Sequence, residues 1–80
     1  MIGLSNISTA KAQSSLLESV KGNPQEAIAL CKEFKALNEK GISASSNIAI
    51  SEVARKRNLN PIDAEILSTY VIGLNCPDVR

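Results

Sequence analysis

The sequence predicts an all-α domain, and three observations support that class. Apolar residues recur at intervals of three and four along most of the chain, which is the period of a helix with one buried face. Asn-Pro pairs at 23–24 and 60–61 each have an acidic residue three positions after the Asn, as at a helix start. One strand-like run, at 48–50, is too short for a strand and has no partner run.

We therefore expect a compact four-helix domain built from two helical hairpins, with helices at about 8–21, 24–40, 46–58 and 61–73. The first helix is closed by Gly22-Asn23. The second begins at the Asn23 cap, with Glu26 as the cap partner, and ends at Lys40-Gly41, where glycine can take a positive φ. Its apolar stripe comprises Ala27, Leu30, Cys31, Phe34 and Leu37.

The third helix is expected to begin within Ser45-Ser46-Asn47, and it turns Ile50, Val53 and Ala54 inward. The fourth begins at the second Asn-Pro pair and cannot continue past Pro77. Its apolar stripe comprises Ile62, Ile66, Leu67, Tyr70, Val71 and Leu74. Residues 1–80 thus form a single small helical domain, with 75–80 as a loose tail.

The two halves also resemble each other at an offset of 37 residues. Residues 12–38 and 49–75 share 8 identities, among them both Asn-Pro pairs, Ala27 with Ala64, and Leu30 with Leu67. Chance alone gives about two at ordinary composition. Duplication and a common way of starting helices both explain the similarity.

Composition excludes several kinds of chemistry. Histidine is absent, which removes the Ser-His-Asp triad and the commonest transition-metal ligand. The carboxylates form no catalytic pair and the four glycines no phosphate loop, so we expect no enzyme activity, no cofactor and no metal. Apolar runs are far too short to span a membrane.

The two cysteines, Cys31 and Cys76, leave a disulfide open but do not favour one, because small folds that rely on disulfides usually carry more cysteines. Cys31 lies on an apolar stripe and is expected in the core. Cys76 falls in the expected tail, where it would be exposed and available for oxidation or crosslinking between molecules. With no signal-peptide pattern, a reduced, cytoplasmic location is the expectation.

Residues 51–67 resemble a bacterial helix-turn-helix. Ala54 is the small residue inside the first helix, Asn58 stands where a turn glycine often occurs, and Leu59 is the apolar residue after it. The resemblance implies a second helix that reads DNA with its first turns. That helix would present Asp63, Ala64, Glu65, Ser68 and Thr69, and its carboxylates would be repelled by phosphates.

The basic run Arg55-Lys56-Arg57 has two interpretations. It can contact phosphates, or it can complement the negative end of its helix and pair with Glu52. The formal net charge of only +1 favours the second.

We therefore predict a small non-catalytic protein–protein interaction module, such as an adaptor, inhibitor or regulatory subunit, with a homodimer as a further option. The alternative is a DNA-binding regulator that uses residues 51–74, so nucleic acid is the second choice of partner. The candidate partner-binding residues are the cations of two exposed helix faces and the single tyrosine: Lys32, Lys35, Arg55, Arg57 and Tyr70.

Overall fold

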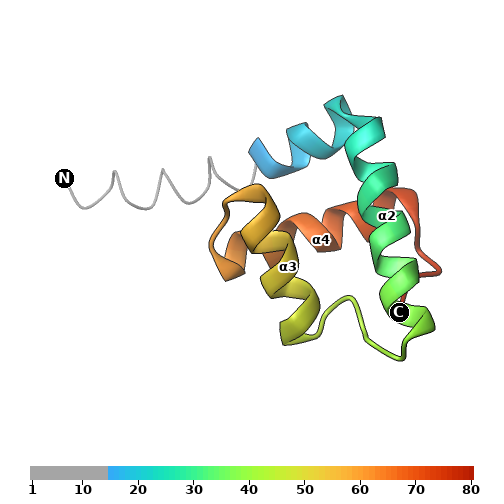
Figure 1. The fold of residues 1–80 in the computed structure, drawn as a ribbon. Coiled ribbons are helices and arrows are strands. Elements are labelled where there is room, and N and C mark those ends of the chain that lie inside the picture. The colour runs from blue at the N-terminus through green and yellow to red at the C-terminus, as the bar shows by residue number, and fades with distance from the viewer. Residues whose placement is uncertain (1–14) are drawn as a thin grey trace.

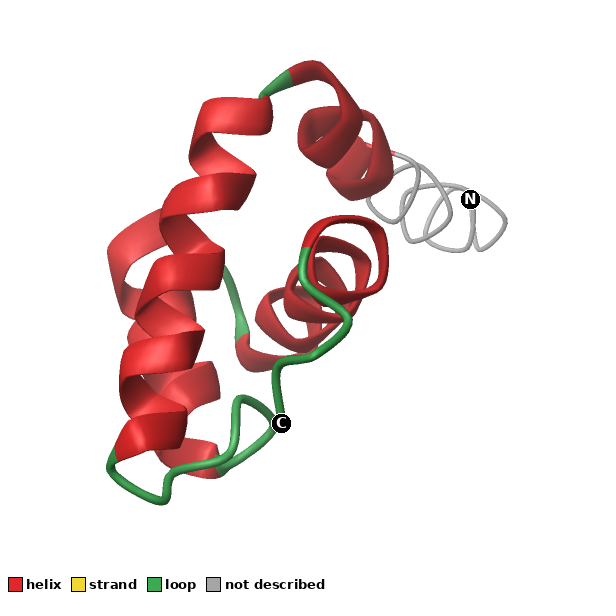
Figure 2. Ribbon diagram, turned by 90° about the vertical axis from the view of Figure 1, so that its right-hand side faces the viewer, coloured by secondary structure: helices red, strands yellow, loops and turns green. Residues whose placement is uncertain are grey.

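The computed structural model describes residues 15–80, and this part of the chain is helical with no strand (Figures 1 and 2). Residues 15–22 form the first helical segment. Three helices follow: α2 (Pro24–Glu39), α3 (Asn47–Arg57) and α4 (Pro61–Asn75). The all-α class is confirmed, and α2, α3 and α4 begin and end within two residues of the predicted bounds. Residues 8–14 of the first expected helix lie outside the described residues, so the arrangement as two hairpins stays a prediction.

The core lies where α4 packs against both α2 and α3. In Figure 1 α4 runs between and behind the other two, and Figure 2 views it nearly along its axis. Ala27 and Ala64 are fully buried, which lets the helix backbones approach closely. The largest fully buried side chains are Phe34, Leu30 and Val71. The predicted stripe of α2 is thus confirmed for its first four residues.

The two Asn-Pro starts differ in the structure. At α4, the Asn60 side chain accepts a hydrogen bond from the Asp63 backbone N–H at 2.8 Å, as expected for a helix cap. At α2, the Asn23 side chain makes no cap hydrogen bond. Glu26 was expected to complete that cap, but its carboxylate forms an ion pair with Arg57 instead. The interaction between α2 and α3 therefore replaces the local capping contact.

The end of α2 matches its sequence signal closely. Gly41 has a φ of +78°, and its N–H donates to the Asn38 carbonyl while the Ile42 N–H donates to that of Leu37. This is the Schellman arrangement, which requires a residue that tolerates the left-handed region. The chain then enters the connection to α3, where Ser46 caps the helix by accepting from the Ala49 N–H. Both ends of this connection are therefore fixed by hydrogen bonds.

The segment after α4 departs most from the sequence prediction. Cys76 is buried, not exposed, and it forms a disulfide with Cys31 of α2. Residues 75–80 are not a loose tail, because Val79 packs into the core and the segment runs beside the end of α2 (Figure 1). The Ala44 N–H donates to the Arg80 carbonyl at 2.8 Å. The disulfide and the backbone hydrogen bond therefore hold in place a segment that was expected to be loose.

The Asn38 side chain binds Arg80 at the end of this segment, so a substitution of Asn38 tests how much the packing of residues 75–80 contributes to stability. Its side-chain amide donates to the Arg80 and Ile42 carbonyls, and its oxygen accepts from the Arg80 N–H at 2.6 Å. We expect Asn38→Ala to lower the free energy of unfolding by about 1–2 kcal/mol. Backbone ¹⁵N relaxation should show increased motion confined to residues 78–80. Asn75→Ala, at an exposed position of α4, is the matched control and should change neither quantity.

Candidate functional site

The fourth helix carries an apolar row that is largely exposed, and within this row Tyr70 packs partly against the core. Ile62, Ile66, Tyr70 and Leu74 follow one another at intervals of four, so they form one ridge along α4. Ile62 is 70% exposed and Leu74 55%, while Ile66 and Tyr70 are half-buried. We call these four residues the α4 ridge. They belong to the apolar stripe predicted for this helix, whose other members, Leu67 and Val71, face the core.

A shallow hollow adjoins the α4 ridge. Ile66 and Tyr70 form one side of it and Glu65 and Thr69 the other, around a volume of about 350 Å³. Single exposed apolar side chains are common on protein surfaces, whereas contiguous ones beside a hollow mark places where another molecule binds. Ile48 of α3 is also exposed, at 61%, but it does not line this hollow. The α4 ridge is therefore the better candidate site.

The charges on α4 are all acidic. Asp63 and Glu65 are its only charged residues, and neither forms an ion pair within residues 15–80. With 3.6 residues per turn, they flank the α4 ridge on opposite sides. The site thus combines an apolar centre with carboxylates at its margins.

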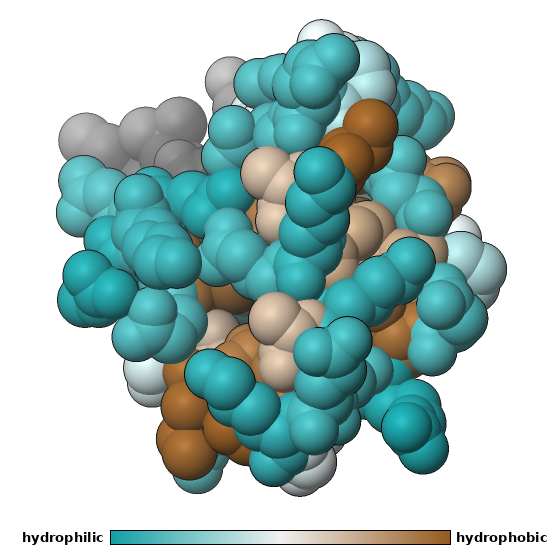
Figure 3. Space-filling view, turned by 45° about the vertical axis from the view of Figure 1, so that its right-hand side comes forward, coloured by the Kyte–Doolittle hydropathy of each residue, from teal (hydrophilic) through white to brown (hydrophobic). Residues whose placement is uncertain are grey.

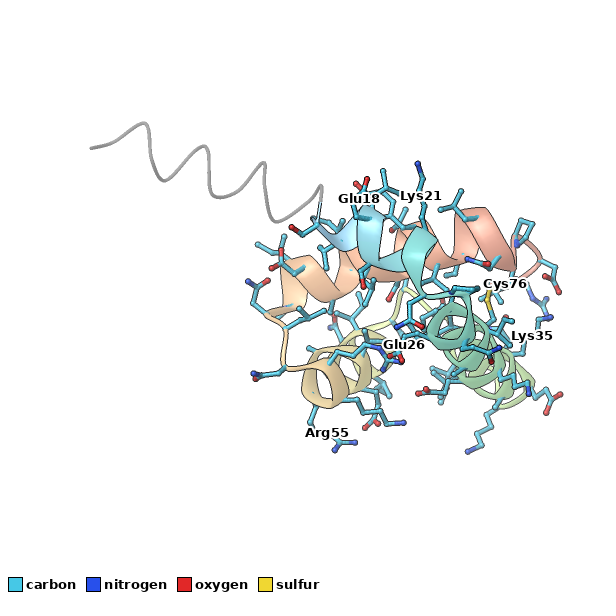
Figure 4. The ribbon with its side chains drawn as sticks, turned by 90° about the horizontal axis from the view of Figure 1, so that it is seen from above. Glu18, Lys21, Glu26, Lys35, Arg55 and Cys76 are labelled. Atoms are coloured by element: carbon cyan, nitrogen blue, oxygen red, sulfur yellow. A yellow bond between two sulfur atoms is a disulfide. The ribbon has the colours of Figure 1, made fainter. Side chains whose placement is uncertain are left out.

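The basic run at the end of α3 is paired with carboxylates. Arg55 pairs with Glu52 at 2.9 Å, and Lys56 pairs with Glu33 of α2 at 2.9 Å. Arg57 Nη2 lies 2.6 Å from Glu26 Oε1. Two of these three cations, Lys56 and Arg57, therefore link α3 to α2. Figure 4 shows Glu26, the partner of Arg57, at a central position in the molecule.

Arg57 also lines the largest hollow described, about 360 Å³, at the seam between residues 15–22, α2 and α4. Its side chain is 17% exposed, and its Nε is buried without a hydrogen-bond partner in the described part of the chain. The floor of the hollow is apolar, from Ala27, Leu30, Leu67 and Val71. Because Arg57 pairs with Glu26, the residues between 15 and 80 that line this seam offer no unpaired charge to a ligand.

The predicted site residues do not gather at one place. Lys35 pairs with Asp78 at 3.7 Å beside the C-terminal segment, and Figure 4 shows Arg55 on another side of the molecule. Lys32 is exposed on α2. Figure 3 shows a mostly hydrophilic surface on the side of α2, with apolar atoms visible between polar side chains. Of the five candidates, Tyr70 alone belongs to the α4 ridge.

The helix-turn-helix resemblance extends to the local geometry. Asn58 has a φ of 55°, in the left-handed region, and the Leu59 N–H donates to the Ala54 carbonyl at 2.9 Å. Two of the five residues expected to face DNA do not reach the surface, however, because Ala64 and Ser68 are buried against the rest of the fold. Ser68 donates its hydroxyl to the Ala64 carbonyl instead. The exposed face of α4 is therefore the one that carries the α4 ridge.

Among residues 15–80, no group of three or more carboxylate and thiol side chains is placed to hold a metal ion. The helices in this range are too short or too polar to cross a membrane.

Comparison with known proteins gives a family but no function. A family model described as a domain of unknown function, DUF8664, matches residues 17–76, and thus most of the described part of the chain. No curated protein and no solved structure matches the chain. The matched range includes all three helices α2, α3 and α4 and both cysteines.

Proposed function

The chain belongs to the DUF8664 family, and we propose that it is a small non-catalytic module that binds a larger protein through the α4 ridge. The observation that carries the proposal is the exposure of Ile62, 70% in a folded chain, at the start of a continuous apolar row. Exposing such a row to water is unfavourable, and covering it with a partner removes that cost. An adaptor, an inhibitor and a regulatory subunit all act by this kind of contact.

The geometry gives less support to the DNA-binding alternative. The helix in the position of a reading helix carries apolar and acidic side chains, with no Lys or Arg between residues 61 and 75. Direct readout depends on donors such as the arginine fork, and affinity depends on unpaired cations near phosphates. The basic residues closest in sequence, Arg55, Lys56 and Arg57, each pair with a carboxylate.

The location of the protein is a separate part of the proposal, for which a cytoplasmic setting is the expectation from sequence. The sequence leaves a disulfide open without favouring one, whereas the structure joins Cys31 and Cys76. Disulfides persist mainly in oxidising compartments. Fractionation of the native host, with thiols blocked before lysis, would give both the location of the protein and the redox state of this pair.

Quantitative affinity capture with matched isoleucine variants tests the proposed function. The full chain is expressed with a tag in its native host as wild type, as Ile62→Ser and as Ile48→Ser. Both positions are exposed isoleucines, at 70% and 61%, so both changes should leave the fold intact. We expect a specific protein to be retained by wild type and Ile48→Ser, and reduced about tenfold or more by Ile62→Ser.

Two results would contradict the proposal. One is equal capture of every partner by both variants, since the α4 ridge would then contribute nothing. The other is a gel shift of duplex DNA that weakens steeply with salt and disappears in Arg55→Ala and Arg57→Ala.

A further inference from the structure

We infer that the partner presents an amphipathic helix with lysine or arginine beside its apolar stripe. This inference rests on the proposed function and adds the shape and charge of the segment that binds. It follows from two features of α4: a groove between two rows of side chains, and margins that are exclusively acidic.

The groove lies between two parallel rows on α4. The first is the α4 ridge, and the second consists of Glu65, Thr69 and Gly73, again at intervals of four. Helices pack by placing the side-chain ridge of one into such a groove of the other. Gly73 leaves the groove open, because a Cβ placed there would meet nothing within 4 Å. The hollow lined by Ile66 and Tyr70 and the open space at Gly73 lie one turn apart on this face, which suits a helix.

The carboxylates on α4 indicate which charges the partner helix carries. Asp63 and Glu65 lie on either side of the α4 ridge, and neither forms an ion pair within residues 15–80. A partner with acidic side chains at its margins would bring like charges together. A partner with Lys or Arg there gains attraction, and desolvation of the apolar centre strengthens it.

The same charges count against a second copy of this chain as the occupant. Two copies of α4 docked through this face would bring four carboxylates to one interface, with no cation from either helix. A homodimer through the α4 ridge would therefore carry repulsion at both margins.

Two synthetic amphipathic helical peptides provide the probes, one of leucine and lysine and one of leucine and glutamate. Binding to the full chain is measured by isothermal titration calorimetry, and the site by backbone amide chemical shifts. We expect the leucine–lysine peptide to bind about tenfold or more tightly than the other, with shifts centred on residues 62–74. The net charge of +1 means that overall attraction does not account for this preference.

Two variants test the two features separately. Glu65→Lys should abolish the preference for the leucine–lysine peptide, because one margin becomes basic while Asp63 keeps the other acidic. Gly73→Gln should weaken binding of the leucine–lysine peptide about tenfold by filling the groove, while its thermal midpoint stays equal or rises, since glutamine favours helix more than glycine does. Ile48→Ser is the control and should leave both affinities unchanged.

The outcomes separate this inference from the proposed function. The inference is overturned if both peptides bind equally, if the leucine–glutamate peptide binds better, or if Glu65→Lys has no effect. It is also overturned if sedimentation shows a dimer that Ile62→Ser dissociates, or if the peptide shifts lie outside α4. In each case the proposed function stands as long as Ile62→Ser still releases a captured partner.

Discussion

Removal of the disulfide should destabilise this domain by about 4 kcal/mol. The bond joins residues 45 positions apart, and closing a loop of that length restricts the unfolded chain by about this amount. A domain of 80 residues has a total stability of about 4–12 kcal/mol, so the bond supplies a large share of it. The disulfide also fixes the segment after α4 to α2, and its loss should therefore loosen residues 76–80.

Urea denaturation of the wild type and of the double variant Cys31→Ser/Cys76→Ser measures this effect. The double variant is preferred because a single change leaves an unpaired thiol in the core. Wild type in strong reductant should approach the stability of the double variant. Because Cys31 and Cys76 are only 7% and 2% exposed, reduction should proceed at the rate of unfolding. Free thiols titrating rapidly in the native protein, or a stability loss under about 1 kcal/mol, would contradict the structural role assigned to this bond.

Much of the helical framework could be predicted because its signals are local. Proline after asparagine, glycine after a basic residue and a serine before α3 each act within one turn of the chain. The stripe of α2 was also predictable, since Ala27, Leu30, Cys31 and Phe34 all lie on one side of the helix and all are buried. The similarity between the two halves has a structural counterpart in the buried pair Ala27 and Ala64.

The disulfide and the packed C-terminal segment could not be predicted in the same way. Whether Cys76 meets Cys31 depends on how α4 crosses α2, which no local pattern specifies. Glu26 illustrates the same limit: its position three residues after Asn23 indicates a cap, but Arg57, distant in sequence, takes the carboxylate. Contacts between segments distant in sequence decided all three features.

The candidate site lies within the apolar stripe predicted for α4, of which only Leu67 and Val71 are buried. The apolar stripe expected for α4 spans about half of the helix circumference, wider than the face one core needs. The structure divides it, with Leu67 and Val71 facing inward and Ile62 facing solvent. The run of Ile62, Ile66, Tyr70 and Leu74 at intervals of four was the available signal, because the buried positions follow a separate row. Packing alone determined which row remained exposed.

Phe34→Ala should cost about 3–5 kcal/mol of stability, a large share of the total of about 4–12 kcal/mol for a domain of this size. Phe34 is the only phenylalanine and is 1% exposed, and it is among the largest fully buried side chains. Phe34→Leu is the matched control, because it keeps most of the apolar volume and should cost about 1.5 kcal/mol or less. Urea denaturation followed by circular dichroism measures both.

The same variant separates folding from binding. Phe34 lies on α2 and takes no part in the α4 ridge, so any loss of partner binding in Phe34→Ala should equal the fraction unfolded. Trimethylamine N-oxide, which favours the compact state, should restore that binding, whereas it should not rescue Ile62→Ser. Ile62 is exposed, so its substitution removes a contact from a chain that is already folded.

A stability loss below about 1 kcal/mol in Phe34→Ala would mean that the core is not organised around this side chain. Full restoration of Ile62→Ser by the osmolyte would assign that residue to folding instead of binding.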